Sequence, residues 1–262
     1  MTARHATVLA VAALAFGGGC APALEAPRCE WSGRVTGRFV YQEQDAISAY
    51  FEVADIDEYR RAVPSPFRMP DRPLLRVSVL DFYEMVNGPT YRESEISILV
   101  TRDGEMGWFV LTMPVTDGDS CWGGRQTWGY PKVVRRITLE RAGGRFVGTS
   151  YAADGQTLDL RLTLETGGAG PGEEARELLR FISPLPNFTL KDGKVLRFGG
   201  GRRDPIYDLE RVQPAVWQVR LGSPRLEFSS APGSLLARLG AGRPLAGYWL
   251  KQRARYSIAP RP

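Results

Sequence analysis

The sequence predicts a single domain of the α+β class, built mainly from antiparallel β-strands with a few short helices. At 262 residues and 43% hydrophobic content, the chain is long enough to bury a substantial core within one domain. Beyond residue 40, short runs alternate between hydrophobic and polar residues and are separated by turn signals such as Asp103-Gly104 and Asp154-Gly155. This alternation at short spacing is typical of antiparallel sheets.

The helices are expected where capping or amphipathic patterns interrupt the alternating runs. Asp55 can cap a helix over Ile56–Val63, which Pro64 would end. Glu173–Phe181 carries glutamates on one side and apolar residues on the other, as a surface helix does. A further short helix is expected over Gly233–Leu239. The predicted strands are, in chain order, Ile47–Val53, Leu74–Leu80, Ile96–Thr101, Gly107–Pro114, Ile137–Glu140, Gly144–Ala152, Thr157–Glu165, Gln213–Leu221, Arg225–Ser229 and Gly247–Ile258.

The first twenty residues have the pattern of an export signal. Ala6–Phe16 is an apolar run after a positively charged start, and it is too short to span a bilayer. Two processing sites compete: Gly19-Cys20 resembles a lipoprotein cleavage point, at which Cys20 would be lipidated, while Ala21-Pro22-Ala23 fits ordinary signal cleavage. The prediction is therefore an exported protein that is periplasmic, anchored to the membrane as a lipoprotein, or secreted. A tether over 21–37 would lead to a domain over 38–262.

Charge and cysteine content narrow the classes of partner. The net charge is +5, but Lys and Arg are scattered among nearly as many acidic residues, so nucleic-acid binding is not indicated. Contact with a membrane is expected only through the lipid anchor. Export permits a disulfide between Cys29 and Cys121, and two buried, unpaired thiols are the alternative. Neither cysteine has a C-x-x-C spacing, so no metal site is expected.

Histidine chemistry is excluded from the mature protein. The chain has one histidine, His5, and it lies inside the predicted signal. A Ser-His-Asp triad, a Cys-His pair, a histidine general base and the common zinc sites all need a residue that the mature chain would lack. Any catalysis must therefore use Lys, Glu, Asp, Tyr or Arg.

Lys132 is the residue with the strongest chemical potential. It follows a rigid Tyr130-Pro131 step and has Trp128, Val133 and Val134 as neighbours in sequence. Desolvation among such side chains disfavours the charged ammonium and favours the neutral amine, which attacks ketone carbonyls. An exposed, inert lysine is the alternative when these residues are considered alone.

The stretch around Lys132 resembles the acetoacetate decarboxylase family. The family carries G-R-E-x-x-[GA]-[FY]-P-K-K, whose first lysine forms a Schiff base with the substrate, and residues 124–133 here read G-R-Q-T-W-G-Y-P-K-V. Residues 57–66, which end in V-P-S-P, and the strand that begins at Pro73 are also similar to the family. Tyr91-Arg92-Glu93-Ser94 matches a Y-x-E-S segment that contributes a glutamate to the active site. The resemblance extends over residues 44–258.

The resemblance implies a cone-like β-barrel or double sheet that encloses the lysine. Lys132 would be the imine-forming nucleophile and Glu93 its proton-handling partner. Arg125, Tyr91 and Tyr130 would contact the substrate, although Arg125 could instead support the loop around it. No cofactor or metal is needed for this chemistry, and homo-oligomers are common in the family.

Four departures weaken the match to the decarboxylases themselves. Val133 replaces a second lysine beside the nucleophile, Ser78 replaces an acidic residue, and Gln126 replaces the glutamate of the G-R-E triplet. No arginine near Gln44 matches the one that helps to hold the substrate carboxylate. We therefore expect Schiff-base lyase chemistry on a small β-keto acid or related oxo acid. An aldolase-dehydratase variant and a non-enzymatic exported barrel that binds an apolar metabolite are the alternatives.

Overall fold

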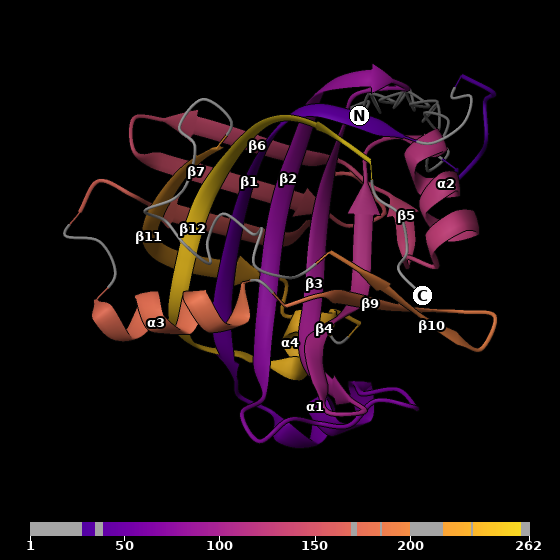
Figure 1. The fold of residues 1–262 in the computed structure, drawn as a ribbon. Helices are drawn as coiled ribbons and strands as arrows, with labels where there is room; N and C mark the ends of the chain where they lie inside the picture. The colour runs from indigo at the N-terminus through magenta and orange to yellow at the C-terminus, as the bar shows by residue number, and fades with distance from the viewer. Residues whose placement is uncertain are drawn as a thin grey trace, which may run out of the picture.

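The computed structural model describes residues 28–34, 39–168, 172–183, 185–199, 217–231 and 233–257, and within them one curled sheet dominates (Figure 1). Four short helices accompany it in these ranges, namely α1 (Ile56–Ala62), α2 (Gly118–Trp128), α3 (Glu173–Ile182) and α4 (Leu235–Leu239). The strands are β1 (Val40–Val53), β2 (Leu74–Asn87), β3 (Tyr91–Arg102), β4 (Glu105–Val115), β5 (Lys132–Val134), β6 (Ile137–Ala142), β7 (Arg145–Tyr151), β8 (Leu158–Glu165), β9 (Asn187–Lys191), β10 (Lys194–Phe198), β11 (Trp217–Phe228) and β12 (Ala241–Tyr256).

The strand order confirms a mainly antiparallel sheet. The path runs β10-β9-β4-β3-β2-β1-β12-β11-β8-β7-β6, and β5 pairs with β4 at its side. Most neighbours are antiparallel, whereas β4 pairs in parallel with both β5 and β9. The long central strands bend across the molecule, so the sheet forms a curled half-barrel (Figure 1). The predicted α+β class with few short helices is therefore correct.

One end of the sheet, β6 to β8, folds back onto the central strands β2 and β3 and encloses the main core. β7 approaches β2 so closely that a Cβ at Gly148 would lie 2.6 Å from the Cβ of Val79. Phe146 stacks on Trp249 with ring centroids 5.0 Å apart, and both side chains are buried. Side chains alternate along a strand, so one face of β1 to β3 packs into this core and the other face points away from it.

Most of the predicted strands are present, and several are longer than the alternation indicated. α1 begins after Asp55, whose side chain accepts from the Glu58 N–H at 2.8 Å, as expected for an N-cap. Two predicted strands, over Gln213–Leu221 and Arg225–Ser229, form one strand, β11, in the described part of the chain. This strand pairs with β12 up to Gly222 and with β8 from Ser223, so it passes from one half of the sheet to the other.

Four elements were not predicted: α2, β5, β9 and β10. α2 has three glycines and no apolar stripe, so its sequence does not show a helical period. Its ends carry the signals instead: Asp117 accepts from the Ser120 N–H at 2.9 Å, and Gly129 ends the helix with a φ of 67°. β9 and β10 form a hairpin whose turn contains Asp192 and Gly193, both with positive φ.

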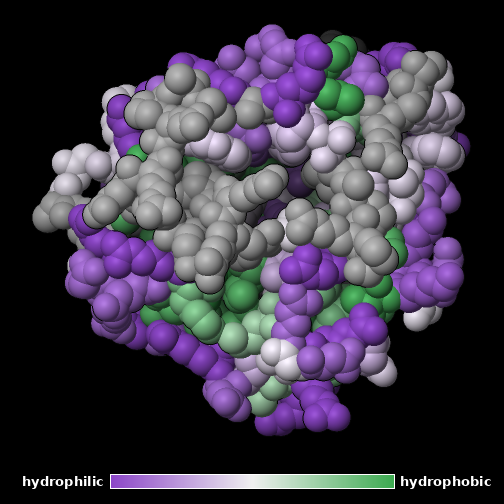
Figure 2. Space-filling model, in the orientation of Figure 1, coloured by the Kyte–Doolittle hydropathy of each residue, from purple (hydrophilic) through white to green (hydrophobic). Residues whose placement is uncertain are grey.

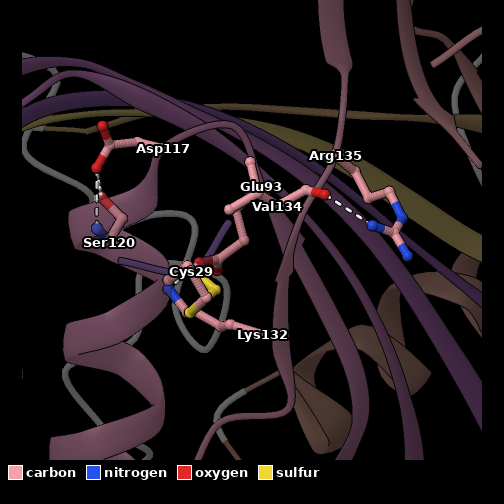
Figure 3. Close-up of a disulfide and its surroundings, with 8 residues drawn as sticks. Cys29, Glu93, Asp117, Ser120, Lys132, Val134 and Arg135 are labelled. Atoms are coloured by element: carbon pink, nitrogen blue, oxygen red, sulfur yellow. Dashed lines mark hydrogen bonds and ion pairs between the residues drawn. A yellow bond between two sulfur atoms is a disulfide. The ribbon is translucent and has the colours of Figure 1, made fainter. Parts of the chain in front are cut away.

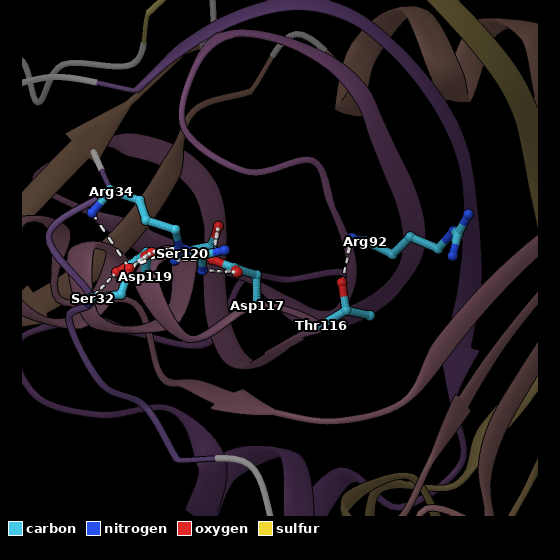
Figure 4. A network of polar contacts seen from close by, with 7 residues as sticks. All are labelled: Ser32, Arg34, Arg92, Thr116, Asp117, Asp119 and Ser120. Carbon is cyan, nitrogen blue, oxygen red and sulfur yellow. Dashed lines mark hydrogen bonds and ion pairs between the residues drawn. The ribbon is translucent and has the colours of Figure 1, made fainter. Parts of the chain in front are cut away.

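Residues 28–34 lie against α2. Cys29 and Cys121 form a disulfide with a Cα–Cα distance of 5.2 Å. Asp119 accepts from the Ser32 backbone N–H at 2.5 Å and from the Arg34 Nε at 2.8 Å (Figure 4). The predicted signal over 1–20, Cys20 and the rest of the predicted tether lie outside the described residues.

On the face shown in Figure 2, hydrophilic residues make up most of the outline, and hydrophobic residues are visible in the lower half. Phe181, at the end of α3, is 53% exposed. None of the helices in the described ranges has the length and apolar content needed to cross a membrane.

Candidate active site

Lys132 is positioned by the turn between α2 and β5. Gly129 takes the left-handed conformation that ends α2, and a Cβ there would lie 2.8 Å from the Leu190 carbonyl oxygen, so the turn requires glycine. The Tyr130 N–H then donates to the Gly124 carbonyl at 3.1 Å. β5 follows in parallel pairing with β4, which fixes Lys132 opposite Met113.

The amino group of Lys132 is buried beside a carboxylate. Lys132 Nζ donates to Glu93 Oε2 at 2.7 Å, and each residue is 6% exposed. The rings of Tyr91 and Tyr130 have centroids 5.2 and 5.8 Å from this nitrogen. Figure 3 shows Lys132 and Glu93 extending from β5 and β3, in the same view as the Cys29 disulfide. A buried ion pair is costly to desolvate and adds little net stability, so this pair is a candidate for a functional role.

The pair lies in the wall of a cavity of about 140 Å³. Residues of α2 and of the first parts of β1 and β3 contribute to its wall. A cavity of similar volume in an apolar core holds benzene, so this one fits a molecule with few non-hydrogen atoms. The lining residues are Phe39, Tyr41, Gln44, Leu80, Phe82, Tyr91, Glu93, Glu95, Met113, Ser120, Gly124, Trp128, Tyr130, Lys132, Asn187 and Tyr256.

Burial changes the acid strength of the groups around the lysine. Desolvation raises the pKa of Glu93 above its ordinary value, and the nearby Lys132 opposes that rise. Burial also raises the pKa of Tyr91 and Tyr130 well above the usual range. Glu93 can therefore hold a proton more readily than an exposed glutamate, and both tyrosine hydroxyls stay protonated.

The structure brings four of the predicted site residues together and leaves one outside. Lys132, Glu93, Tyr91 and Tyr130 all line the cavity. Arg125 is exposed on α2 and does not line it, so the structure does not place Arg125 where a substrate in this cavity would touch it. The adjacent Gly124 faces the lysine instead, and a Cβ there would collide with Cδ and Cε of Lys132.

Two departures from the family pattern lie away from the cavity. Val133 is next to Lys132 in a strand, so its side chain points to the opposite face, and it does not line the cavity. Ser78 hydrogen-bonds Ser48 at 2.8 Å and does not line the cavity either. Val133, which replaces the family's second lysine, therefore adds no side chain to the cavity wall.

A third departure does lie in the cavity wall. Gln44 donates to Gln252 at 3.1 Å and accepts from the Tyr256 hydroxyl at 2.5 Å. Among the described residues that line the cavity, Lys132 is the only cation.

Sequence reasoning missed several residues of the wall, and Glu95 is the most consequential. It is two residues after Glu93, and residues two apart on a strand share a face, so the position of Glu93 was a sufficient signal for Glu95. Tyr41 and Tyr256 were also missed, because their strands were predicted too short or without regard to which face they used. Among the described residues, no group of three or more His, Cys, Asp or Glu side chains could hold a metal ion.

The fold and the cavity together define a β-rich half-barrel protein with a buried lysine–carboxylate pair. The family model for acetoacetate decarboxylase matches residues 22–257, so the chain belongs to the acetoacetate decarboxylase family. An acetoacetate decarboxylase of Ralstonia nicotianae is 28% identical over 188 residues, covering 69% of this chain and 70% of that protein. One from Chromobacterium violaceum is 31% identical over 157 residues, and the match spans only 59% of the length of each.

Solved structures show the same fold at low sequence identity. An acetoacetate decarboxylase from Legionella pneumophila has a TM-score of 0.63 at 16% identity, covering 95% of this chain and 99% of that one. The enduracididine biosynthesis enzyme MppR, solved with pyruvate, has a TM-score of 0.62 at 13% identity, covering 88% of this chain and 92% of that one.

Proposed function

We propose that the protein is a Schiff-base-forming carbon–carbon lyase that acts on a small β-keto acid or related oxo acid through Lys132. The observation that carries the proposal is the 2.7 Å hydrogen bond between Lys132 and Glu93 in the wall of a small cavity. Family membership supports the same chemistry, since the relatives from Chromobacterium violaceum and Ralstonia nicotianae are acetoacetate decarboxylases.

The first step requires a neutral amine on Lys132. The proton of the ammonium can pass to Glu93 along the hydrogen bond, and burial favours this transfer because it raises the pKa of the Glu93 carboxyl. The lysine nitrogen then attacks the carbonyl carbon of the substrate. Glu93 returns its proton to the carbonyl oxygen, the lysine nitrogen gives up one of its two hydrogens to the same oxygen, and water leaves. The product of the step is a protonated imine between Lys132 and the substrate.

The second step breaks the bond to the carboxylate. The protonated imine accepts the electron pair of that bond, carbon dioxide leaves, and an enamine remains. The enamine carbon then takes a proton from an acid in the cavity wall, for which Glu93 and the protonated hydroxyls of Tyr91 and Tyr130 are within the same cavity. Water hydrolyses the resulting imine and releases a ketone and the free lysine.

The cavity also supports an aldolase-dehydratase variant of this chemistry. No arginine is among the described residues that line it, so the wall departs here from the decarboxylase pattern that the sequence resembles. A pyruvate imine could lose a proton instead of carbon dioxide, and the enamine so formed would attack an aldehyde. MppR has been solved with the condensation product of pyruvate and imidazole 4-carboxaldehyde.

Product analysis distinguishes these reactions. The purified protein would be incubated with acetoacetate, and separately with pyruvate and a small aldehyde, while carbon dioxide and condensation products are measured. The proposal expects carbon dioxide release from β-keto acids that is lost in Lys132→Gln and kept in Lys191→Gln, a lysine of β9. Condensation without release would identify the aldolase-dehydratase variant, and no reaction in either assay would favour the non-enzymatic binder.

We also propose that the protein is exported, with or without a lipid on Cys20. The Cys29–Cys121 disulfide supports this proposal, because disulfides persist mainly in oxidising compartments. Fractionation of cells that express the full chain, followed by mass analysis of the mature N-terminus, tests it. An intact Met1 form in the cytoplasm would contradict it.

A further inference from the structure

A second carboxylate, that of Glu95, faces the same cavity as the lysine pair. Glu93 and Glu95 are two residues apart in β3, so both point to one side of the strand and their Cα atoms are about 7 Å apart. Glu95 is 6% exposed and lines the cavity. The proposed reaction uses Lys132 and Glu93 but gives Glu95 no part.

The hydrogen bonds of Glu95 are all on one of its two oxygens. Oε1 accepts from Nε of Arg76 at 3.1 Å, from the Nη2 of the same guanidinium, and from the hydroxyl of Ser97. Oε2 has no hydrogen-bond partner among the described residues, and it is not a fully enclosed atom. One acceptor oxygen of a buried carboxylate is thus left for whatever occupies the cavity.

The neighbouring amide supplies a donor at the same place. Asn187, at the start of β9, lines the cavity and accepts from Arg76 Nη2 through its Oδ1 at 2.6 Å. Because a guanidinium can only donate, this contact fixes the orientation of the amide and leaves its NH₂ group to other partners. Arg76 therefore holds both side chains, so that an acceptor and a donor remain.

We propose that Glu95 and Asn187 form a subsite for a hydroxyl group on the substrate, an inference that rests on the imine chemistry proposed for Lys132. A hydroxyl donates one hydrogen bond and accepts others, so it can donate to Glu95 Oε2 and accept from the Asn187 amide. The preferred substrate class is then a hydroxylated small oxo acid.

Other substituents fit this part of the wall less well. A carboxylate would be repelled by Glu95, since Arg76 is already neutralised by it at a buried ion pair. An alkyl group would displace water from Glu95 and Asn187 without replacing its hydrogen bonds. A site built to bind a hydroxyl therefore discriminates against the analogue that lacks one.

Two probes of the same size isolate this difference. 3-Hydroxypyruvate and 2-oxobutanoate have the same number of non-hydrogen atoms and differ only in a hydroxyl against a methyl group. An equimolar mixture would be reduced with borohydride in the presence of the protein, and the two adducts at Lys132 would be counted by mass spectrometry. Since the ketones differ in intrinsic reactivity, the informative value is the adduct ratio in the wild type divided by that in a variant.

Glu95→Gln is the main variant. The amide oxygen of the introduced glutamine turns to Arg76, so its NH₂ group faces the cavity and can no longer accept from a hydroxyl. The ratio of hydroxylated to alkyl adduct should fall roughly tenfold to a hundredfold, as expected for the loss of a hydrogen bond to a charged group. Glu105→Gln, which weakens the exposed ion pair with Arg197, is the matched control and should leave the ratio unchanged.

The outcomes separate the subsite from the imine chemistry. Asn187→Ala removes the donor and should lower the ratio by a smaller factor, and it decides the question if Glu95→Gln does not fold. Normal trapping at Lys132 with an unchanged ratio in a folded variant would overturn the subsite alone. Trapping of neither compound by the wild type would overturn the imine chemistry and the subsite together.

Discussion

The two faces of β3 show how one strand serves both stability and chemistry. On one face, Ile96, Ile98 and Val100 are buried in the main hydrophobic core. On the other, Tyr91, Glu93 and Glu95 are equally buried but line the cavity. Both faces are shielded from water, and only one is apolar.

Burial alone therefore does not identify a core position in this sheet. The apolar face gains free energy from every side chain that leaves water. The cavity face buries carboxylates, which is unfavourable unless each has a partner, and Lys132 and Arg76 are those partners. Substitutions on the cavity face should therefore change activity first, and substitutions on the core face should change stability first.

Among substitutions on the cavity face, Lys132→Gln should reduce activity most. Removal of the nucleophile should lower the rate of carbon dioxide release by several orders of magnitude, to the level of the uncatalysed reaction. Circular dichroism should show that the fold is retained. A variant that keeps a substantial part of the wild-type rate would show that the cavity face has no covalent role.

Glu93→Gln should have the next largest effect. A group that transfers protons in the rate-limiting step typically contributes about 10² to 10⁴-fold, and the rate should fall within that range. Single-turnover measurements of imine formation and carbon dioxide release would locate the affected step. An unchanged rate on a verified substrate would remove Glu93 from the mechanism.

Ile98→Ala should produce the opposite pattern. Ile98 is fully buried on the core face, and its truncation should reduce the free energy of unfolding by about 2–5 kcal/mol. Urea denaturation measures this loss, while imine formation by the remaining folded protein should be unchanged. A selective loss of activity without destabilisation would break the division between the two faces.

Glu93 should also make the free energy of unfolding depend on pH, and this effect should be smaller than those above. Burial raises the folded-state pKa of Glu93 above its ordinary value of 4.5, so the unfolded chain releases this proton first as pH rises. The difference in free energy of unfolding between the wild type and Glu93→Gln is therefore most favourable to the wild type below pH 4.5. This contribution decreases as pH rises through the folded-state pKa of Glu93. Denaturation curves for both proteins across this window measure the difference. A relative stability that increases with pH would contradict the direction of the shift.

The sequence predicted the fold class because alternation survives wherever one strand face is polar. It predicted α1 from a different signal, because Asp55 is a residue type that caps helix N-termini. α2 was missed because its sequence has no apolar stripe. Its glycines allow close contact with neighbouring groups, as at Gly124 beside Lys132. The Asp192-Gly193 turn between β9 and β10 is a hairpin signal that the sequence does contain.

The residues of the candidate site were predictable where a short sequence motif contains them. Lys132 and Glu93 were identified through the family motif, and the structure places them 2.7 Å apart. Arg125 belongs to the same motif but is exposed, because the helix that contains it turns that side chain away from the cavity. Glu95 follows from Glu93, since residues two apart on a strand share a face. Asn187 comes from a distant strand, and its contact with Glu95 through Arg76 depends on the tertiary fold, which no local pattern contains.

Borohydride trapping shows whether Lys132 forms an imine. The chain has four lysines, so Lys191, Lys194 and Lys251 serve as internal controls in the same digest. With acetoacetate or pyruvate present, a reduced adduct should be found at Lys132 and not at the other three. Two results would contradict imine formation by an activated Lys132. One is a folded protein with no adduct at Lys132 for any small oxo acid, and the other is equal adducts at all four lysines.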